Sequence, residues 1–317
     1  MYFRKYGFMV PSQVKGVFYG IVAAAAYGMN PLFTLPLYKL GLTAESVLFY
    51  RYLLAVVMLF GVMKLQHASF ALPWKLVIPA LICGVLVALS SLLLFLSYQK
   101  MDAGIASTIL FIYPVMVAVM MSGIFHEKIT FSTILGVLGA LLGVGILYRG
   151  GEGGVLSFCG VLLVLGSALS YAIYMVAIKQ SALGKMTSVP LTFYILLFGL
   201  PLFLLRTRGG LDVQWIPSWF GLGCVIGLGV FPTVISFLLM TMAIKLIGAT
   251  KTAILGALEP VTALLVGIFL FGEQLTLRST IGILIILLAV TVVITGCRMN
   301  FIGKMICYLP GRRKDMR

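Results

Sequence analysis

Glu259 and the proline that follows it, Pro260, are the residues of this chain best suited to chemistry inside an apolar environment. They lie near the middle of residues 248–276, GATKTAILGALEPVTALLVGIFLFGEQLT, which read as a membrane-spanning helix. An ionisable side chain near the bilayer centre costs about 2.5 kcal/mol or more unless it pairs or faces water. Glu259 therefore lines a cavity or carries protons, or it is a structural carboxylate bonded to a neighbouring helix. Pro260 lacks a backbone donor and so should free the carbonyl of Gly256.

A second proline-containing stretch, residues 103–130, repeats this pattern as AGIASTILFIYPVMVAVMMSGIFHEKIT. A shift of 146 positions superposes Pro114 on Pro260. Tyr113 then falls where the later stretch has Glu259. The chain is therefore an internal duplication, and we predict one proline-kinked helix in each half. The same shift superposes Phe125 on Phe271, Glu127 on Glu273, Thr130 on Thr276 and Gly136 on Gly282.

Four other charged residues lie inside apolar runs or at their ends. Arg51 follows Glu45 by six positions, so its side chain either snorkels to the outer surface or acts inside. In the second case it binds a substrate carboxylate or neutralises Glu259. Lys251 is an interfacial anchor or meets an anion at the mouth of a cavity. The remaining two, Glu127 and Glu273, are expected to cap or anchor the ends of their spans.

Two pairs of polar residues occupy neighbouring positions on predicted helices, and both helices are the first of their half. One pair is Tyr27 with Asn30, and the other is Tyr171 with Tyr174. Because the two helices are repeat partners, both faces are expected to line the same cavity with hydroxyl, amide and aromatic groups. Helix packing and an aromatic belt at the membrane surface are the alternatives for each residue.

The elements that position these residues follow from composition, since 62% of the 317 residues are hydrophobic and only 10% are charged. With a mean hydropathy of +1.15, the chain cannot bury its apolar surface in a water-facing globule. A bilayer needs about 20 apolar residues per helix. We predict an all-α integral membrane protein with ten transmembrane helices, at about 15–38, 45–63, 74–97, 103–125, 131–148, 155–178, 187–205, 218–243, 249–271 and 279–296.

Each half holds five predicted spans, an odd number, so the second half should enter the membrane from the opposite side. The expected arrangement is two inverted five-helix repeats, which can rock between forms open to either side of the membrane. Lysine and arginine gather in the loops that then face the cytoplasm, which places both termini inside. The predicted parts are a cytoplasmic N-terminus (1–14), a first repeat (15–148), a second repeat (155–296) and a basic cytoplasmic tail (297–317).

Several function classes lack support in the sequence. His126-Glu127 begins HEKIT, which has no second histidine for a zinc-binding helix, and neither a nucleophile elbow nor a phosphate-binding loop is present. The five cysteines have no metal-ligand spacing. We therefore predict no enzyme, no metal and no cofactor. The formal net charge of +15 reflects the cytoplasmic loops and a tail suited to anionic lipid, without the features of a nucleic-acid-binding module.

The segments YGMNPLF and FYRYLLAVVMLF, together with the paired ends IYPVMVAVMMSGIFHE and LEPVTALLVGIFLFGE, resemble the EamA type of the drug/metabolite transporter superfamily. The resemblance covers about residues 15–296. Two departures from the family pattern make the cavity asymmetric. Tyr27 replaces a tryptophan that is common in the first span, and Tyr113 stands opposite Glu259.

The resemblance implies a secondary transporter in the cell inner membrane that moves a small polar metabolite, an amino acid or related compound, by alternating access. Export is the expected direction. The expected partners are this metabolite, membrane lipids and protons, and the expected unit is a monomer without nucleic acid. An intramembrane enzyme and a structural membrane protein without transport activity are the alternatives. Substrate-binding candidates are Glu259, Tyr113, Tyr27, Asn30, Tyr171, Tyr174, Arg51 and Lys251, with helix kinks at Pro114 and Pro260.

Overall fold

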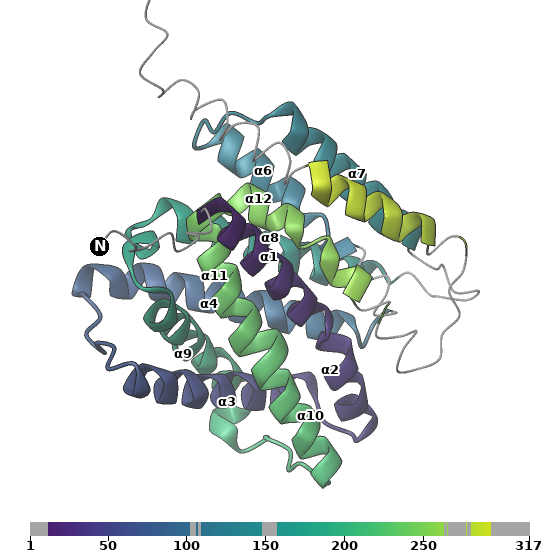
Figure 1. Cartoon of the computed structure of the whole chain (residues 1–317). Helices are drawn as coiled ribbons and strands as arrows, with labels where there is room; N and C mark the ends of the chain where they lie inside the picture. Colours follow the sequence, from purple (N-terminus) through teal and green to yellow (C-terminus); the bar gives the residue numbers. More distant parts are fainter. Residues whose placement is uncertain are drawn as a thin grey trace, which may run out of the picture.

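The computed structural model describes residues 12–101, 106, 109–147, 157–262, 265, 277 and 280–292, and every regular element among them is helical (Figure 1). The prediction of an all-α chain is thus confirmed for these residues. The first half contributes α1 (Ser12–Gly28), α2 (Asn30–Lys39), α3 (Ala44–Leu65), α4 (Trp74–Ser97), α6 (Tyr113–Gly123) and α7 (Phe131–Leu147).

The second half begins with α8 (Phe158–Gln180) and α9 (Ser188–Arg206), which the short 3-10 helix η1 (Ala182–Lys185) connects. A second 3-10 helix, η2 (Arg208–Gly210), follows α9. The chain then runs through α10 (Trp219–Gly229), the π-helical turn η3 (Val230–Ile235), α11 (Ser236–Ile247) and α12 (Ala249–Leu255). A further helix covers 280–292.

Within the described part of the chain, six helical segments are long and apolar enough to cross a membrane: Ser12–Lys39, Ala44–Leu65, Trp74–Ser97, Phe158–Gln180, Ser188–Arg206 and Trp219–Ile247. Their limits lie within a few residues of the predicted runs. Three shorter apolar helices, Tyr113–Gly123, Phe131–Ile146 and Thr280–Val292, fall inside further predicted runs. The remaining run, 249–271, and the predicted role of Glu273 extend beyond the described residues, so the count of ten stays a prediction.

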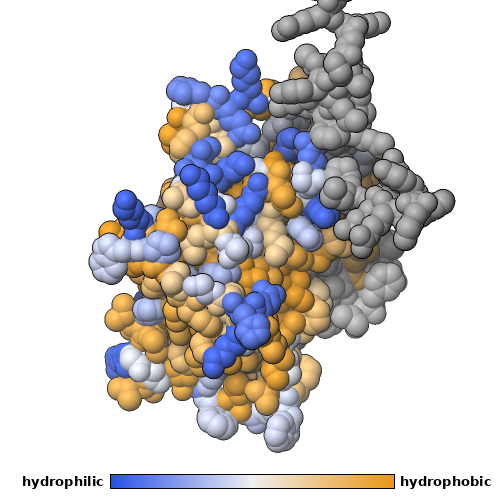
Figure 2. Space-filling view, turned by 60° about the vertical axis from the view of Figure 1, so that its left-hand side comes forward, coloured by the Kyte–Doolittle hydropathy of each residue, from blue (hydrophilic) through white to orange (hydrophobic). Residues whose placement is uncertain are grey.

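Many large apolar side chains face outward, as a lipid-embedded surface requires. Phe18, Val57, Ile78 and Leu142 are each more than half exposed. Figure 2 shows apolar residues over much of one face, with several hydrophilic residues grouped in its upper part. Lipid tails solvate such a surface, whereas water would not.

Serine residues and glycine residues hold the helices at close range. Ser236 on α11 donates to the carbonyl of Ala23 on α1 over 2.9 Å, and Ser167 on α8 donates to the carbonyl of Ser90 on α4 over 2.7 Å. A Cβ at Gly84 would lie only 2.6 Å from the Ile195 carbonyl oxygen, so α4 and α9 approach backbone to backbone. Small residues permit such contacts between membrane helices.

The helical path is interrupted directly before each of the two aligned prolines. α12 ends at Leu255, residues 256–257 form a turn, and helical residues resume at 258. In the first half, residues 111–112 form a turn before α6 begins at Tyr113. The Gly256 carbonyl, expected to be freed by Pro260, accepts from the backbone N–H of Glu259 over 2.9 Å. The turn therefore satisfies this group within its own segment and sets the direction in which the Glu259 side chain leaves the helix.

Candidate functional site

The Glu259 side chain meets the tyrosine that occupies its aligned position in the first half. The Tyr113 hydroxyl donates to Oε1 of Glu259 over 3.4 Å, and both residues are buried, with Glu259 8% exposed. Gly256 provides the necessary room, because a Cβ at this position would lie 1.6 Å from the Tyr113 hydroxyl oxygen. The short segment 256–259 thus carries both the carboxylate and the gap into which the Tyr113 hydroxyl fits.

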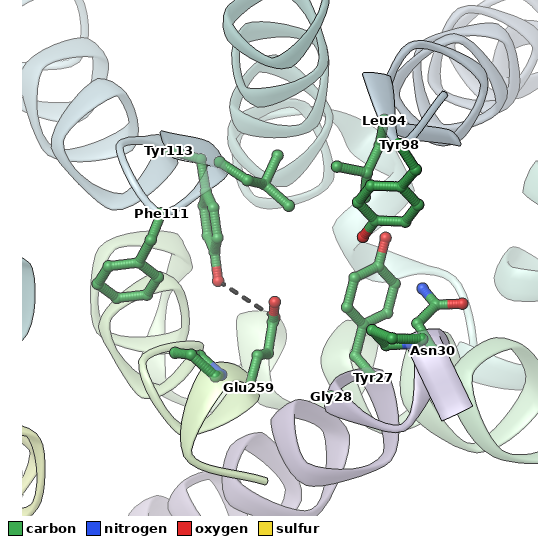
Figure 3. A pocket seen from close by; sticks show the side chains of 11 residues that line it. Tyr27, Gly28, Asn30, Leu94, Tyr98, Phe111, Tyr113 and Glu259 are labelled. Atoms are coloured by element: carbon green, nitrogen blue, oxygen red, sulfur yellow. Dashed lines mark hydrogen bonds between the residues drawn. The ribbon is translucent and has the colours of Figure 1, made fainter. Parts of the chain in front are cut away.

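A cavity of about 40 Å³ lies beside this pair. Figure 3 shows Glu259 and Tyr113 on one side and Tyr27, Asn30 and Tyr98 on the other. Its lining comes from the α1–α2 junction, the end of α4, the start of α6 and the turn before Pro260: Tyr27, Gly28, Asn30, Pro31, Leu94, Tyr98, Leu110, Phe111, Tyr113, Glu259 and Pro260. Polar and aromatic groups from both halves of the chain therefore share one small space.

Tyrosine rings form the wall next to this cavity. Tyr27 stacks on Tyr171 with ring centroids 6.4 Å apart and an interplanar angle of 19°. Tyr171 also meets the edge of Tyr113 at 5.2 Å and stacks on Tyr174 at 5.7 Å. Because offset and edge-to-face ring pairs are favourable arrangements, this wall is a rigid partition that joins α1, α6 and α8.

Arg51 lies inside the protein and is fully buried, so the alternative in which it snorkels to the surface is wrong. Its Nε donates to Thr233 Oγ1 over 2.6 Å, Nη1 donates to Asn30 Oδ1 over 3.2 Å, and Nη2 donates to the Pro232 carbonyl over 3.1 Å. Its guanidinium carbon also lies 5.8 Å from the Tyr27 ring centroid. Through these contacts α3 is bonded to the π-helical turn η3.

The structure sorts the candidate residues into three groups. Tyr27, Asn30, Tyr113, Glu259 and Pro260 line the cavity together. Arg51, Tyr171 and Tyr174 are buried directly behind that lining, whereas Lys251 on α12 is partly exposed and Pro114 packs at the start of α6 without lining the cavity.

Several lining residues were not among the predicted site residues, among them Tyr98, Phe111 and Gly28. Gly28 could have been predicted from the sequence, since it directly follows the candidate residue Tyr27 in the first predicted span. A Cβ there would lie 2.4 Å from the Glu259 carbonyl oxygen, so α1 touches the backbone of the carboxylate-bearing segment. Tyr98 and Phe111 lie at helix ends, where the pattern of apolar residues does not indicate which way a side chain points.

The chemical capacity of this site is recognition of a small polar molecule. It offers one carboxylate, several phenol hydroxyls and one amide within an apolar shell, the usual composition of a small-molecule site. Among the described residues no group of three or more His, Cys, Asp or Glu side chains could hold a metal ion.

Several helices long and apolar enough to cross a membrane, all within the described part of the chain, define a polytopic membrane protein. Comparison with known families narrows this class. The model of the EamA-like transporter family matches residues 14–149 and again residues 158–295, so the chain belongs to this family and contains its domain twice.

Similar curated proteins are named as transporters. An uncharacterized transporter of Archaeoglobus fulgidus is 34% identical over 198 residues, which cover 61% of this chain and 68% of that protein. The uncharacterized transporter YcbK of Bacillus subtilis is 23% identical over 86% of this chain and 90% of its own length. A protein of known crystal structure shares the fold with a TM-score of 0.77 at 16% identity, over 88% of this chain and 96% of that one.

Proposed function

We propose that this protein is a secondary transporter that moves a small polar metabolite, an amino acid or related compound, across the cell inner membrane by alternating access. Export is the proposed direction. The observation that carries the proposal is the Tyr113–Glu259 hydrogen bond beside a cavity lined by both halves. A buried carboxylate with one neutral partner and an open side is suited to bind a cationic group or a proton.

The positions that meet at the cavity support two repeats related by a pseudo-two-fold axis. Tyr113 and Glu259 are separated by 146 positions, the shift that superposes the two proline segments. Tyr27 and Tyr171 are separated by 144 positions, correspond in the alignment of the first spans, and stack on one another. A residue contacts its own equivalent only near a symmetry axis, so both pairs support an axis through the cavity wall.

The packing of the helices has the same two-fold pattern, in which equivalent helices of the two halves make equivalent contacts. In chain order, α1 and α8 are the first helices of their halves, and α4 and the α10–α11 segment are the third. α1 packs on α11 of the other half, and α8 packs on α4 of the other half. The second helices, α3 and α9, pack on each other, and so do α6 and α12. This reciprocal pattern supports two equivalent halves that move against one another around a shared site.

Ten spans in two inverted five-helix repeats, over 15–148 and 155–296, give the arrangement that alternating access needs. With that count, the excess of lysine and arginine in the inner loops favours a cytoplasmic position for both termini, 1–14 and 297–317. An inverted pair can open to either side with nearly equal energy because each half repeats the other's contacts.

The size of the cavity bears on the transport cycle. A volume of about 40 Å³ has room for no more than a few water molecules, whereas small-molecule sites usually exceed about 300 Å³. Loading a metabolite therefore requires α1 to separate from the segment that carries Glu259. The close approach of Gly28 to the Glu259 carbonyl is one contact that this separation would break.

Profiling of the external medium tests the proposal directly. Cells that overproduce the wild-type chain are compared with Glu259→Gln and with Glu127→Gln, an exposed acidic residue outside the cavity lining, all at matched membrane abundance. One class of small polar metabolites should accumulate outside wild-type and Glu127→Gln cells and not outside Glu259→Gln cells. Equal profiles for wild type and empty cells would contradict export, and formation of a new covalent product would favour the enzyme alternative.

A further inference from the structure

The buried cation Arg51 lacks a carboxylate partner among the described residues, where the only two ion pairs are Arg206–Glu45 and Arg208–Asp212. All three of its hydrogen bonds go to neutral oxygens. Placing a full positive charge in a membrane interior without a counter-charge is costly. The site is therefore electrostatically incomplete as it stands.

Unused hydrogen-bond donors gather around this cation. A guanidinium carries five N–H groups, and three of those on Arg51 donate to Thr233, Asn30 and Pro232, while the Tyr27 hydroxyl is a further neutral partner of the same side chain. Asn30 is only 2% exposed, and its amide nitrogen has no hydrogen-bond partner among the residues that the structure describes. The hydroxyl of Thr34, one helical turn further along α2, is likewise buried and unpartnered. Leaving such donors unpaired is costly, because each has lost its hydrogen bonds to water without gaining others.

Asn30 connects Arg51 with the cavity. Its side chain lines the cavity that also contains Glu259, while its Oδ1 accepts from Arg51. The Tyr27 ring stands between the two charges, since it lines the same cavity and lies under the guanidinium at 5.8 Å. Figure 3 shows Asn30 and Tyr27 on the side of the cavity opposite Tyr113 and Glu259.

We propose that Arg51 and Asn30 form the anion subsite of the transporter, which binds a carboxylate of the transported molecule. The inference rests on the proposed function and deepens it, because it assigns a negatively charged group to the substrate and fixes the end at which that group binds. The guanidinium of Arg51 complements the charge of a carboxylate, and the unpaired Asn30 amide adds a hydrogen-bond donor. Glu259 and the Tyr113 hydroxyl then form the opposite wall, which receives a cationic or donor group.

The site is polarised because the two halves carry different residues at a few positions, although the neighbouring positions of the two repeats match. Phe49 and Tyr50 align with Phe193 and Tyr194 at a shift of 144 positions, which places Ile195 opposite Arg51. The same shift places Tyr174 opposite Asn30. The first half therefore supplies the cation and the amide, and the second half supplies the carboxylate, so a bound molecule has one preferred orientation.

The test uses sodium acetate as the carboxylate probe and acetamide as its neutral isostere. The thermal unfolding midpoint of the purified full chain is measured while acetate replaces chloride at constant ionic strength. Arg51→Gln also removes the bonds to Thr233 and Pro232, so the informative variant is Asn30→Asp. It keeps the oxygen that accepts from Arg51 and supplies a permanent carboxylate next to the guanidinium. Arg206→Gln removes a half-exposed positive charge elsewhere and serves as the control.

Wild type and Arg206→Gln should show a saturable rise of the midpoint with acetate and none with acetamide. Asn30→Asp should unfold at the same or a higher temperature than wild type without acetate and should not respond to it. The inference is overturned if wild type ignores acetate, responds equally to acetamide, or responds in the same way as Asn30→Asp. Export that depends on Glu259 would survive such a result, whereas an acetate response without export would remove the transport proposal and keep the anion subsite.

Discussion

The Tyr113 hydroxyl donates to Oε1 of Glu259 over 3.4 Å, and these two residues occupy the same position of the two sequence repeats. A symmetric ancestor of this arrangement would place two identical side chains face to face. Two carboxylates in contact would repel one another in an apolar interior, whereas a carboxylate and a phenol form a hydrogen bond. The difference between the two halves is therefore what makes the pair stable, and it also leaves one carboxylate for function.

Tyr113→Phe should weaken substrate binding without dismantling the fold, because phenylalanine keeps the ring and loses only the donor to Glu259. Loss of a hydrogen bond to a charged group costs about 1 to 3 kcal/mol, which corresponds to roughly a 5- to 150-fold rise in the half-saturating substrate concentration. Initial export rates in membrane vesicles measure this. Tyr50→Phe, which loses an exposed bond to the Gln214 carbonyl, should leave that concentration unchanged. Equal effects of the two variants on this concentration would show that the Tyr113 hydroxyl does not contribute to substrate binding.

Gly256→Ala should disable transport because its methyl group needs the space that the Tyr113 hydroxyl occupies. We expect at least a tenfold loss of export rate, as the tyrosine must leave Glu259 or the turn must shift. The matched control is Gly145→Ala, where an added Cβ meets nothing within 4 Å, so export should persist. Wild-type rates in Gly256→Ala would show that the pairing is dispensable.

Export should depend on pH through Glu259 if the proton gradient drives the transporter. Wild-type vesicles with a fixed internal pH should change their initial rate as the external pH is varied. Glu259→Gln should abolish this dependence because the amide cannot exchange a proton. An unchanged pH profile and rate in Glu259→Gln would assign the carboxylate a purely structural role.

Thr233→Val should destabilise the protein by about 1 to 3 kcal/mol, because its hydroxyl serves two buried partners at once. Thr233 Oγ1 accepts from Arg51 Nε over 2.6 Å and donates to the Leu228 carbonyl over 2.7 Å. Thr252→Val, which loses a single bond to the Gly248 carbonyl one turn earlier, should have a smaller effect. Thermal unfolding of the purified variants in detergent compares them, and equal midpoints would mean that η3 does not depend on Arg51.

The inverted arrangement predicts opposite sides of the membrane for two aligned loops. Single cysteines in 126–130 should react with a membrane-impermeant thiol reagent from the cytoplasmic side, and single cysteines in 273–278 from the outer side. Labelling in intact cells and in inverted vesicles, on a background without the five native cysteines, distinguishes them. Reaction of both loops from the same side would end the inverted-repeat model.

Span limits and cavity residues differ in how well the sequence predicts them. The limits predicted from apolar runs match the six long helices within a few residues, because bilayer thickness dictates span length whatever the neighbouring helices are. The side chains that would face one cavity were predictable only where polarity was unusual, as at Glu259, Tyr27 and Asn30. Leu94 and Phe111, which also line the cavity, look like any other residues of an apolar span.

The amino-acid sequence alone predicts a duplicated, helical membrane protein in which one carboxylate, Glu259, lies in the middle of an apolar run of the second half. Apolar composition and a repeated proline motif are properties of the linear sequence, so they can be recognised without knowing how the helices pack. The folded structure was needed to see that Arg51 turns inward to Asn30 and Thr233, and that Tyr113 contacts Glu259, its counterpart in the other repeat. Such contacts join residues that are far apart along the chain, and they depend on how the helices pack and turn against one another, which no single helix specifies.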